Sequence, residues 1–133
     1  MHLPNNTIVA VADGEKFHLF RAHGGASLEL KPAGHPHVEG SNHSGGARHH
    51  SSAAEPAEKQ DAEDVHAAAT AEFLNREALA NRIAHAVVIA PPKMLGELRK
   101  HYHKTFESKL LGEIAKDMTG QGREVIAAAI EKA

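Results

Sequence analysis

Residues 7–14 read Thr-Ile-Val-Ala-Val-Ala-Asp-Gly, and they predict the first strand of a sheet together with the turn that follows it. The run Thr7–Ala12 is rich in β-branched and apolar residues, which is typical of a buried strand. Asp13 and Gly14 both tolerate the positive φ that tight hairpin turns need. We therefore expect a second strand over Lys16–His23, which ends at Gly24-Gly25.

A third strand and a long helix are expected on either side of a low-complexity segment. Leu28–Lys31 is a short alternating stretch, and Pro32 ends it because proline cannot donate a hydrogen bond to the ladder. The long helix opens at Glu55-Pro56, where proline suits the first turn, and it runs to near Asn81. Its expected buried stripe steps at helical spacing through Ala62, Val65, Ala69 and Phe73.

The second half of the chain alternates strands and helices. Ala86–Ala90 is a continuous apolar run, as expected for a central parallel strand that is covered on both faces. Helices are expected over Lys93–Tyr102 and over Arg123–Lys132. Between them, the apolar residues of Leu110–Lys116 fit either a helix stripe or a short strand.

With a strand at residues 110–116, the order of elements is β-β-β-α-β-α-β-α. Two hairpins followed by right-handed β-α-β crossovers make a mixed five-stranded sheet with flanking helices. The sequence therefore predicts the α/β class, with the element order of the ribonuclease H-like architecture.

Length and composition predict one ordinary globular domain over residues 1–133. Apolar residues make up 41% of the chain and charged residues 24%, which are values near the globular norm. The absence of cysteine excludes disulfides, thiolate metal sites and cysteine nucleophiles. No apolar run is long enough to span a bilayer, and Met1–Asn6 has no signal-peptide pattern. We therefore expect a cytoplasmic protein that does not contact membranes.

The ribonuclease H-like order raises the hypothesis of a metal nuclease, which the carboxylates do not favour. Two-metal hydrolysis needs several carboxylates that converge from different strands. Asp13 follows the first strand, but the strand Ala86–Ala90 is followed by Pro91 and offers no carboxylate. Asp13 is therefore interpreted as a turn residue. No Gly-x-Ser-x-Gly elbow is present either, so the residue patterns predict no catalytic residue.

Histidine is the unusual feature of the composition, with 12 residues in the chain. Five of them lie in the Gly- and Ser-rich stretch Ala33–Ala54, which we expect to be a long mobile loop. These five imidazoles are candidate ligands for Zn²⁺ or Ni²⁺: His35, His37, His43, His49 and His50. Their spacing matches no tight structural motif, so the first interpretation is a flexible polar loop. Metal binding and pH sensing are the two alternatives.

The same loop contains Gly45, Gly46 and Arg48, which together are a candidate contact for phosphate. Glycines permit close approach of the backbone to a ligand, and arginine binds phosphate through two parallel hydrogen bonds. The spacing matches neither a Walker loop nor a dinucleotide fingerprint. Glycines that only keep the loop flexible are the alternative.

Positive charge is concentrated in residues 91–116, which contain six cationic and three acidic side chains. Residues 55–82 have the opposite balance, with seven acidic and three cationic side chains. A basic helix is able to contact RNA phosphates, whereas the alternative is an ordinary solvated helix face. The candidate RNA contacts are Lys93, Arg99, Lys100 and Lys104.

Three segments together resemble the bacterial host attachment protein family. They are Val11–Gly14, Val87–Arg99 and Glu113–Thr119, of which the second is the most specific. The resemblance extends over nearly the whole chain, and it implies that Leu110–Lys116 is a strand. This family is in turn similar to the central domain of eukaryotic and archaeal class 1 release factors and of the ribosome-rescue factor Pelota.

In release factors, a Gly-Gly-Gln loop between the third strand and the long helix promotes hydrolysis of peptidyl-tRNA. Gly45-Gly46 falls at that place in this chain, but the next residue is Ala47. The glutamine that orients the chemistry is therefore missing, and the resemblance does not imply peptide release.

We therefore expect a release-factor central-domain-like protein with a non-enzymatic role. It would bind ribosomes or RNA through the loop 33–54 and the basic second helix, without a cofactor. Two alternatives stay open, namely metal binding by the histidine-rich loop and hydrolysis of a peptidyl or nucleotidyl ester. A direct adhesin is not expected, because the sequence has no export signal, and the patterns leave the oligomeric state open.

Overall fold

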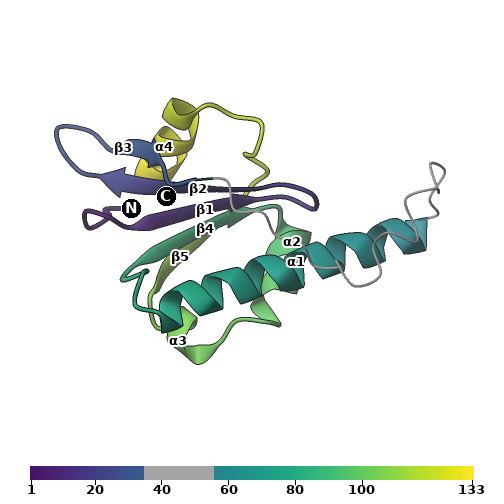
Figure 1. Ribbon diagram of the computed structural model, residues 1–133. Coiled ribbons are helices and arrows are strands. Elements are labelled where there is room, and N and C mark those ends of the chain that lie inside the picture. The colour runs from purple at the N-terminus through teal and green to yellow at the C-terminus, as the bar shows by residue number, and fades with distance from the viewer. Residues whose placement is uncertain (35–55) are drawn as a thin grey trace.

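The computed structural model describes residues 1–34 and 56–133, and for residues 56–58 the backbone alone. Figure 1 shows the arrangement of the elements. They are β1 (Ile8–Ala12), β2 (Phe17–His23), β3 (Glu29–Pro32), α1 (Pro56–Leu79), β4 (Ala86–Ala90), α2 (Pro92–Arg99), α3 (Lys104–Glu107), β5 (Leu110–Ala115) and α4 (Arg123–Lys132).

The sheet has five strands in the order β3-β2-β1-β4-β5. β1 pairs with β2 and β2 with β3 in antiparallel orientation, whereas β4 runs parallel to both β1 and β5. Helices α1, α2 and α3 cover one face of this sheet, and α4 covers the other (Figure 1). The predicted mixed five-stranded α/β architecture is confirmed.

The two central strands carry the core. Every residue of β1 and β4 is buried, because each strand is covered on both faces. Alternate side chains point to opposite layers: Ala10 and Val88 face α1 and α2, whereas Val9 and Val87 face α4. Apolar runs without alternation are therefore explained by helices on both sides of the sheet.

Residues 110–115 form the strand β5, which settles the choice between helix and strand. The register with β4 shifts within this strand, because Ala86 lies opposite Leu110 and Val87 opposite Gly112. Leu111 is therefore an extra residue in a bulge, and its side chain is 44% exposed. At the other edge, Pro32 is the last residue of β3, at a position where a missing N–H is tolerated.

The expected buried stripe of α1 is wrong. Ala62 is exposed, and Val65, Ala69 and Phe73 are only half-buried. The side that packs on the sheet lies on nearly the opposite face of the helix and consists mainly of small residues: Ala67, Ala71, Leu74 and Ala78. Alanine side chains let the helix approach the sheet closely, so the smallest residues rather than the bulkiest occupy the interface.

The prediction of one helix over Lys93–Tyr102 is also wrong, because α2 ends at Arg99 and a separate short helix, α3, follows. Asn75 on α1 explains the break, since its side chain binds both sides of it. The amide nitrogen donates to the carbonyl of His101 at 2.9 Å, and the amide oxygen accepts from the N–H of His103 at 2.9 Å. His103 then caps α3 by accepting a hydrogen bond from the N–H of Thr105.

Asn81 ends α1 in the left-handed region, with φ at 63°. Its N–H donates to the carbonyl of Ala78, and the N–H of Arg82 reaches back to the carbonyl of Glu77. This is a Schellman motif, which favours Gly or Asn at the left-handed position. We expect Asn81→Ala to lower the free energy of unfolding by about 1 kcal/mol and Asn81→Gly to leave it unchanged or raise it. Urea denaturation measures both, and an alanine variant as stable as the parent would contradict this assignment.

Candidate nucleic-acid interface

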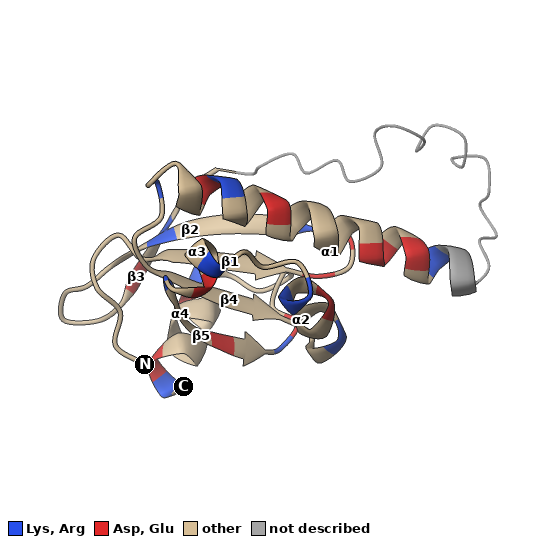
Figure 2. Ribbon diagram, turned by 90° about the horizontal axis from the view of Figure 1, so that it is seen from below, with Lys and Arg blue, Asp and Glu red and all other residues tan. Residues whose placement is uncertain are grey.

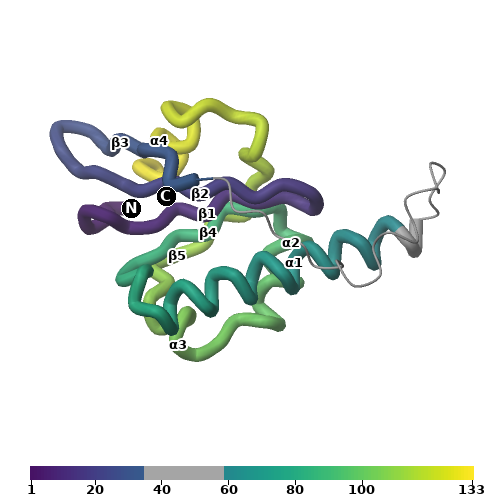
Figure 3. Tube along the Cα trace, viewed as in Figure 1, coloured from purple at the N-terminus to yellow at the C-terminus, as the bar shows by residue number. Residues whose placement is uncertain are grey.

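The glycine and arginine candidates of the long connection, Gly45, Gly46 and Arg48, lie outside the described residues. The structure describes the two elements that flank the connection, since β3 ends at Pro32 and α1 begins at Pro56. The first turns of α1 extend beyond the edge of the sheet (Figures 1 and 3). The connection therefore leads from an edge strand to the projecting end of the longest helix.

The five histidines proposed as metal ligands fall in the same stretch: His35, His37, His43, His49 and His50 also lie outside the described residues. Within residues 1–34 and 56–133, no group of three or more His, Asp or Glu side chains is arranged to hold a metal ion. Binding of Zn²⁺ or Ni²⁺ stays a prediction that concerns only residues 35–55.

Two of the four predicted RNA contacts already have acidic partners. Arg99 forms an ion pair with Glu113 on β5, with Nη2 and Oε1 2.7 Å apart. Lys100 forms one with Glu97, with Nζ and Oε1 3.0 Å apart. Each pair raises the pKa of its base, through the hydrogen bond first and the opposite charge second. Figure 2 shows basic and acidic positions interspersed on α2, so the face is less positive than the count of cations predicts.

The Arg99–Glu113 pair belongs to the packing of the domain. The Glu113 side chain is only 16% exposed, and the Tyr102 ring packs against Phe106 with centroids 4.9 Å apart. Burial, and next the charge of Glu113, raises the pKa of the Tyr102 hydroxyl above its usual range, whereas Arg99 acts in the opposite direction. Arg99 therefore neutralises a half-buried carboxylate, which is a structural role.

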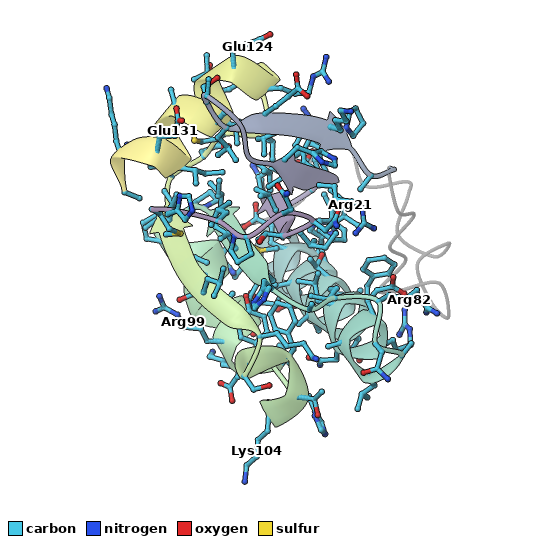
Figure 4. The ribbon with its side chains drawn as sticks, turned by 90° about the vertical axis from the view of Figure 1, so that its left-hand side faces the viewer. Arg21, Arg82, Arg99, Lys104, Glu124 and Glu131 are labelled. Carbon is cyan, nitrogen blue, oxygen red and sulfur yellow. The ribbon has the colours of Figure 1, made fainter. Side chains whose placement is uncertain are left out.

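Lys93 and Lys104 are exposed and make no ion pair with any described residue. Lys104 begins α3, at the far end of the α2–α3 corner (Figure 4). Lys93 lies near the start of α2, beside a crevice of about 420 Å³ at the carboxyl ends of β1 and β4. Of the predicted contacts, these two keep their charge available for phosphate.

The crevice beside Lys93 does not suit a phosphate. Three lysines line it against six carboxylates, and the carboxylates come from four parts of the chain: Asp13, Glu15, Glu63, Asp64, Glu97 and Asp117. Glu63 and Asp64 on α1 are half-buried here. The negative balance favours no polyanion inside the crevice.

Asp13 is the turn residue that the sequence predicts, but neither Asp13 nor Gly14 has the positive φ on which that prediction was based. Its carboxylate accepts hydrogen bonds from the N–H groups of Glu15 and Lys16, and from the hydroxyl of Thr119 at 2.7 Å. Burial raises the pKa of Asp13, but these hydrogen bonds and the charge of Lys16 outweigh it, so the pKa lies below its ordinary value of 3.8. Asp13 therefore joins the β1–β2 turn to the segment after β5.

Sequence reasoning missed one juxtaposition of basic and aromatic residues. Arg21 on β2, Phe73 on α1 and Arg82 after α1 line a common pocket, although they are up to 61 positions apart in the chain. No local motif joins them. The signal available in the sequence was Arg21 itself, a cation within an otherwise apolar alternation.

The fold and the long connection between β3 and α1 define an α/β domain of the kind that the resemblance to release factors predicts. The family model described as Bacterial archaeo-eukaryotic release factor family 12 matches residues 6–130, so the chain belongs to this family. Neither a curated protein nor a solved structure gives a match. The family match supports the release-factor relationship, whereas the host attachment name stays a prediction. Of the helices in the described ranges, none has the length and apolar character needed to cross a membrane.

Proposed function

We propose that this protein is a release-factor-like domain that associates with the ribosome by binding RNA. The observation that carries the proposal is the family match, which covers 125 of the 133 residues, from residue 6 to residue 130. The role is non-enzymatic, because Ala47 stands where the release-factor loop has its glutamine. An effect on host attachment is then indirect, through the expression of other proteins.

The RNA contacts proposed on the described residues are Lys104 and, with a smaller contribution, Lys93. Both cations are exposed and unpaired within the described ranges, so phosphate does not have to compete with a carboxylate for them. Lys100 is equally exposed but shared with Glu97, and Arg99 is shared with Glu113. The loop residues Gly45, Gly46 and Arg48 complete the proposed interface.

Co-sedimentation with ribosomes from the protein's own host, at low and high salt, tests the proposal. We expect the protein to migrate with ribosomal particles at low salt and to dissociate as salt rises. Lys93→Gln combined with Lys104→Gln is expected to weaken the association several-fold. It should also reduce the slope of log K against log salt by roughly 0.7–0.9 for each phosphate that the protein no longer neutralises.

Lys100→Gln is the matched control, since it removes the same charge four residues away from Lys104. Its effect is expected to be smaller, because the Lys100 ammonium is already engaged by Glu97. Equal losses of affinity in Lys100→Gln and Lys104→Gln would contradict the assignment of the contact residues. A protein that stays at the top of the gradient in both salts would contradict the proposed function itself.

A further inference from the structure

A pocket of about 290 Å³ lies between β2, the second half of α1 and the turn that precedes β4. Polar and apolar groups share its wall about equally, and the large apolar side chains in it are Ile8, Leu19, Phe73 and Ile83. Arg21 and Arg82 line it from two different elements, and both lie on the same side of the molecule (Figure 4). We call it the Arg21 pocket. A concave site that combines apolar side chains with a few polar groups is the usual form of a small-ligand site.

The β2–β3 register places a second cation next to Arg21. Arg21 lies opposite Ile8 on one side and opposite Lys31 on the other. Residues directly opposite each other share a face of the sheet, so Arg21 and Lys31 both lie on the face that α1 covers. Like charges in this position repel, and neither residue has an ion-pair partner within the described ranges. A bound anion would relieve this repulsion.

Arg82 is held in place beside the pocket by two independent features. The Schellman motif at Asn81 brings the backbone of Arg82 over the last turn of α1. Glu77 then fixes the guanidinium, since its Oε2 accepts from Nε at 3.0 Å and from Nη2 at 2.8 Å. The charge of Arg82 is therefore balanced by Glu77, as that of Arg99 is by Glu113, and Arg82 contributes only its Nη1 hydrogen-bond donors to a ligand.

The charged groups around the pocket favour an anion. Arg21 and Lys31 are positive and have no ion-pair partner within the described ranges, whereas the charge of Arg82 is balanced by Glu77, the only carboxylate that lines the pocket among the described residues. Glu29 lies on the same face as Lys31 but two positions before it, at the start of β3 and opposite His23. The balance next to the pocket is therefore positive, in contrast to the crevice beside Lys93.

An aromatic ring gives the pocket a second recognition element. Phe73 is half-buried and is braced by Phe17, with ring centroids 5.6 Å apart and the planes at 76°. Aromatic side chains beside cationic ones are the usual platform for the bases of single-stranded nucleic acids. A volume of about 290 Å³ lies at the lower end of ligand pockets, so it suits one nucleotide and not a longer ligand.

We propose that the Arg21 pocket binds one nucleotide of single-stranded RNA. The base packs against Phe73 and its apolar neighbours, and the phosphate is held at the rim by the unpaired Arg21, with a hydrogen bond from Nη1 of Arg82. The proposal rests on the proposed association with RNA and adds a base-recognition site to it that includes neither Lys93 nor Lys104.

Fluorescence anisotropy of a short labelled oligouridylate with the full chain tests the phosphate contact. We expect Arg21→Gln to raise Kd roughly tenfold and to reduce the salt slope by about 0.7, the value for one contact to a single strand. Lys132→Gln is the matched control, because it removes one cation on α4, which covers the other face of the sheet. Its Kd is expected to stay within about twofold of the parent.

Phe73→Leu tests the base contact separately, since it keeps apolar bulk but removes the ring. We expect Kd to rise roughly fivefold with an unchanged salt slope, because the variant loses stacking and keeps its charge. Thermal unfolding verifies that the variant is folded. Arg21 is partly exposed, so Arg21→Gln keeps the test decisive even where Phe73→Leu is unstable.

The outcomes separate this proposal from the proposed function. Equal Kd values for Arg21→Gln and Lys132→Gln would overturn the pocket. Failure to bind the oligouridylate would overturn it as well, even where co-sedimentation with ribosomes persists. Binding that depends on Arg21 and Phe73, in a protein that does not co-sediment, would support the pocket and contradict the ribosome proposal.

Discussion

Replacement of Phe106 by alanine is expected to lower the free energy of unfolding by about 3–5 kcal/mol, the usual cost of truncating a fully buried phenylalanine. The Phe106 side chain is 0% exposed and packs in the layer between the sheet and helices α1 and α2. It also belongs to α3, which has only four residues. A helix of that length has no stability of its own, so this one side chain anchors the α2–β5 corner.

Urea denaturation followed by circular dichroism measures the change. Phe106→Leu is the control, because it keeps apolar volume and should cost less than about 2 kcal/mol. An alanine variant within about 1 kcal/mol of the parent would show that α3 is not held by this contact.

Replacement of Asp13 by alanine is expected to cost about 2 kcal/mol. The carboxylate accepts hydrogen bonds from two backbone N–H groups and from Thr119, and alanine leaves all three donors without this acceptor. Thr119→Val removes only the tertiary bond and should cost less. A double-mutant cycle between the two positions isolates their coupling, and strict additivity would contradict a direct bond between Asp13 and Thr119.

The same carboxylate predicts a pH dependence. The pKa of Asp13 is lower in the folded chain than its ordinary value of 3.8, so the folded state favours the ionised form. Its contribution to stability is therefore present above the unfolded pKa and is lost as pH falls through the lower folded pKa. The stability difference between the parent and Asp13→Asn should shrink below about pH 4. A difference that stays constant down to pH 2 would contradict the assignment.

The predicted RNA contacts were inferred from the number of cations in residues 91–116, and such a count does not show which of those cations are already paired with a carboxylate. Residues 91–116 do carry the excess of basic side chains that the sequence indicates. Arg99 has its partner on another element, since Glu113 on β5 lies 14 positions after it, whereas Lys100 pairs with Glu97 three positions before it on α2. A count of charges along the chain contains no information on which residues pack together, so Arg99 was taken as available although its contact with Glu113 neutralises it.

The sequence by itself determined the strands β1 to β4, the β1–β2 turn and the long helix that follows the connection in this protein. Thr7–Ala12 and Ala86–Ala90 are apolar and β-rich over their whole length, and Asp13-Gly14 supplies the turn residues. These signals are local, because side-chain periodicity and backbone preferences act over a few neighbouring residues. The family resemblance added the strand at residues 110–116, where periodicity alone fitted two structures.

Only the tertiary structure decided which face of α1 is buried, where α2 ends and which charges remain unpaired. Ala67, Ala71 and Ala78 are on the buried face of α1 because the helix lies close to the sheet, where small side chains fit. The end of α2 is set by hydrogen bonds from Asn75, which lies 26 and 28 positions before its partners. The Arg21 pocket joins β2, α1 and the turn before β4 in the same way. Each of these features depends on contacts between residues far apart in the chain, which exist only once the sheet and its helices have packed together.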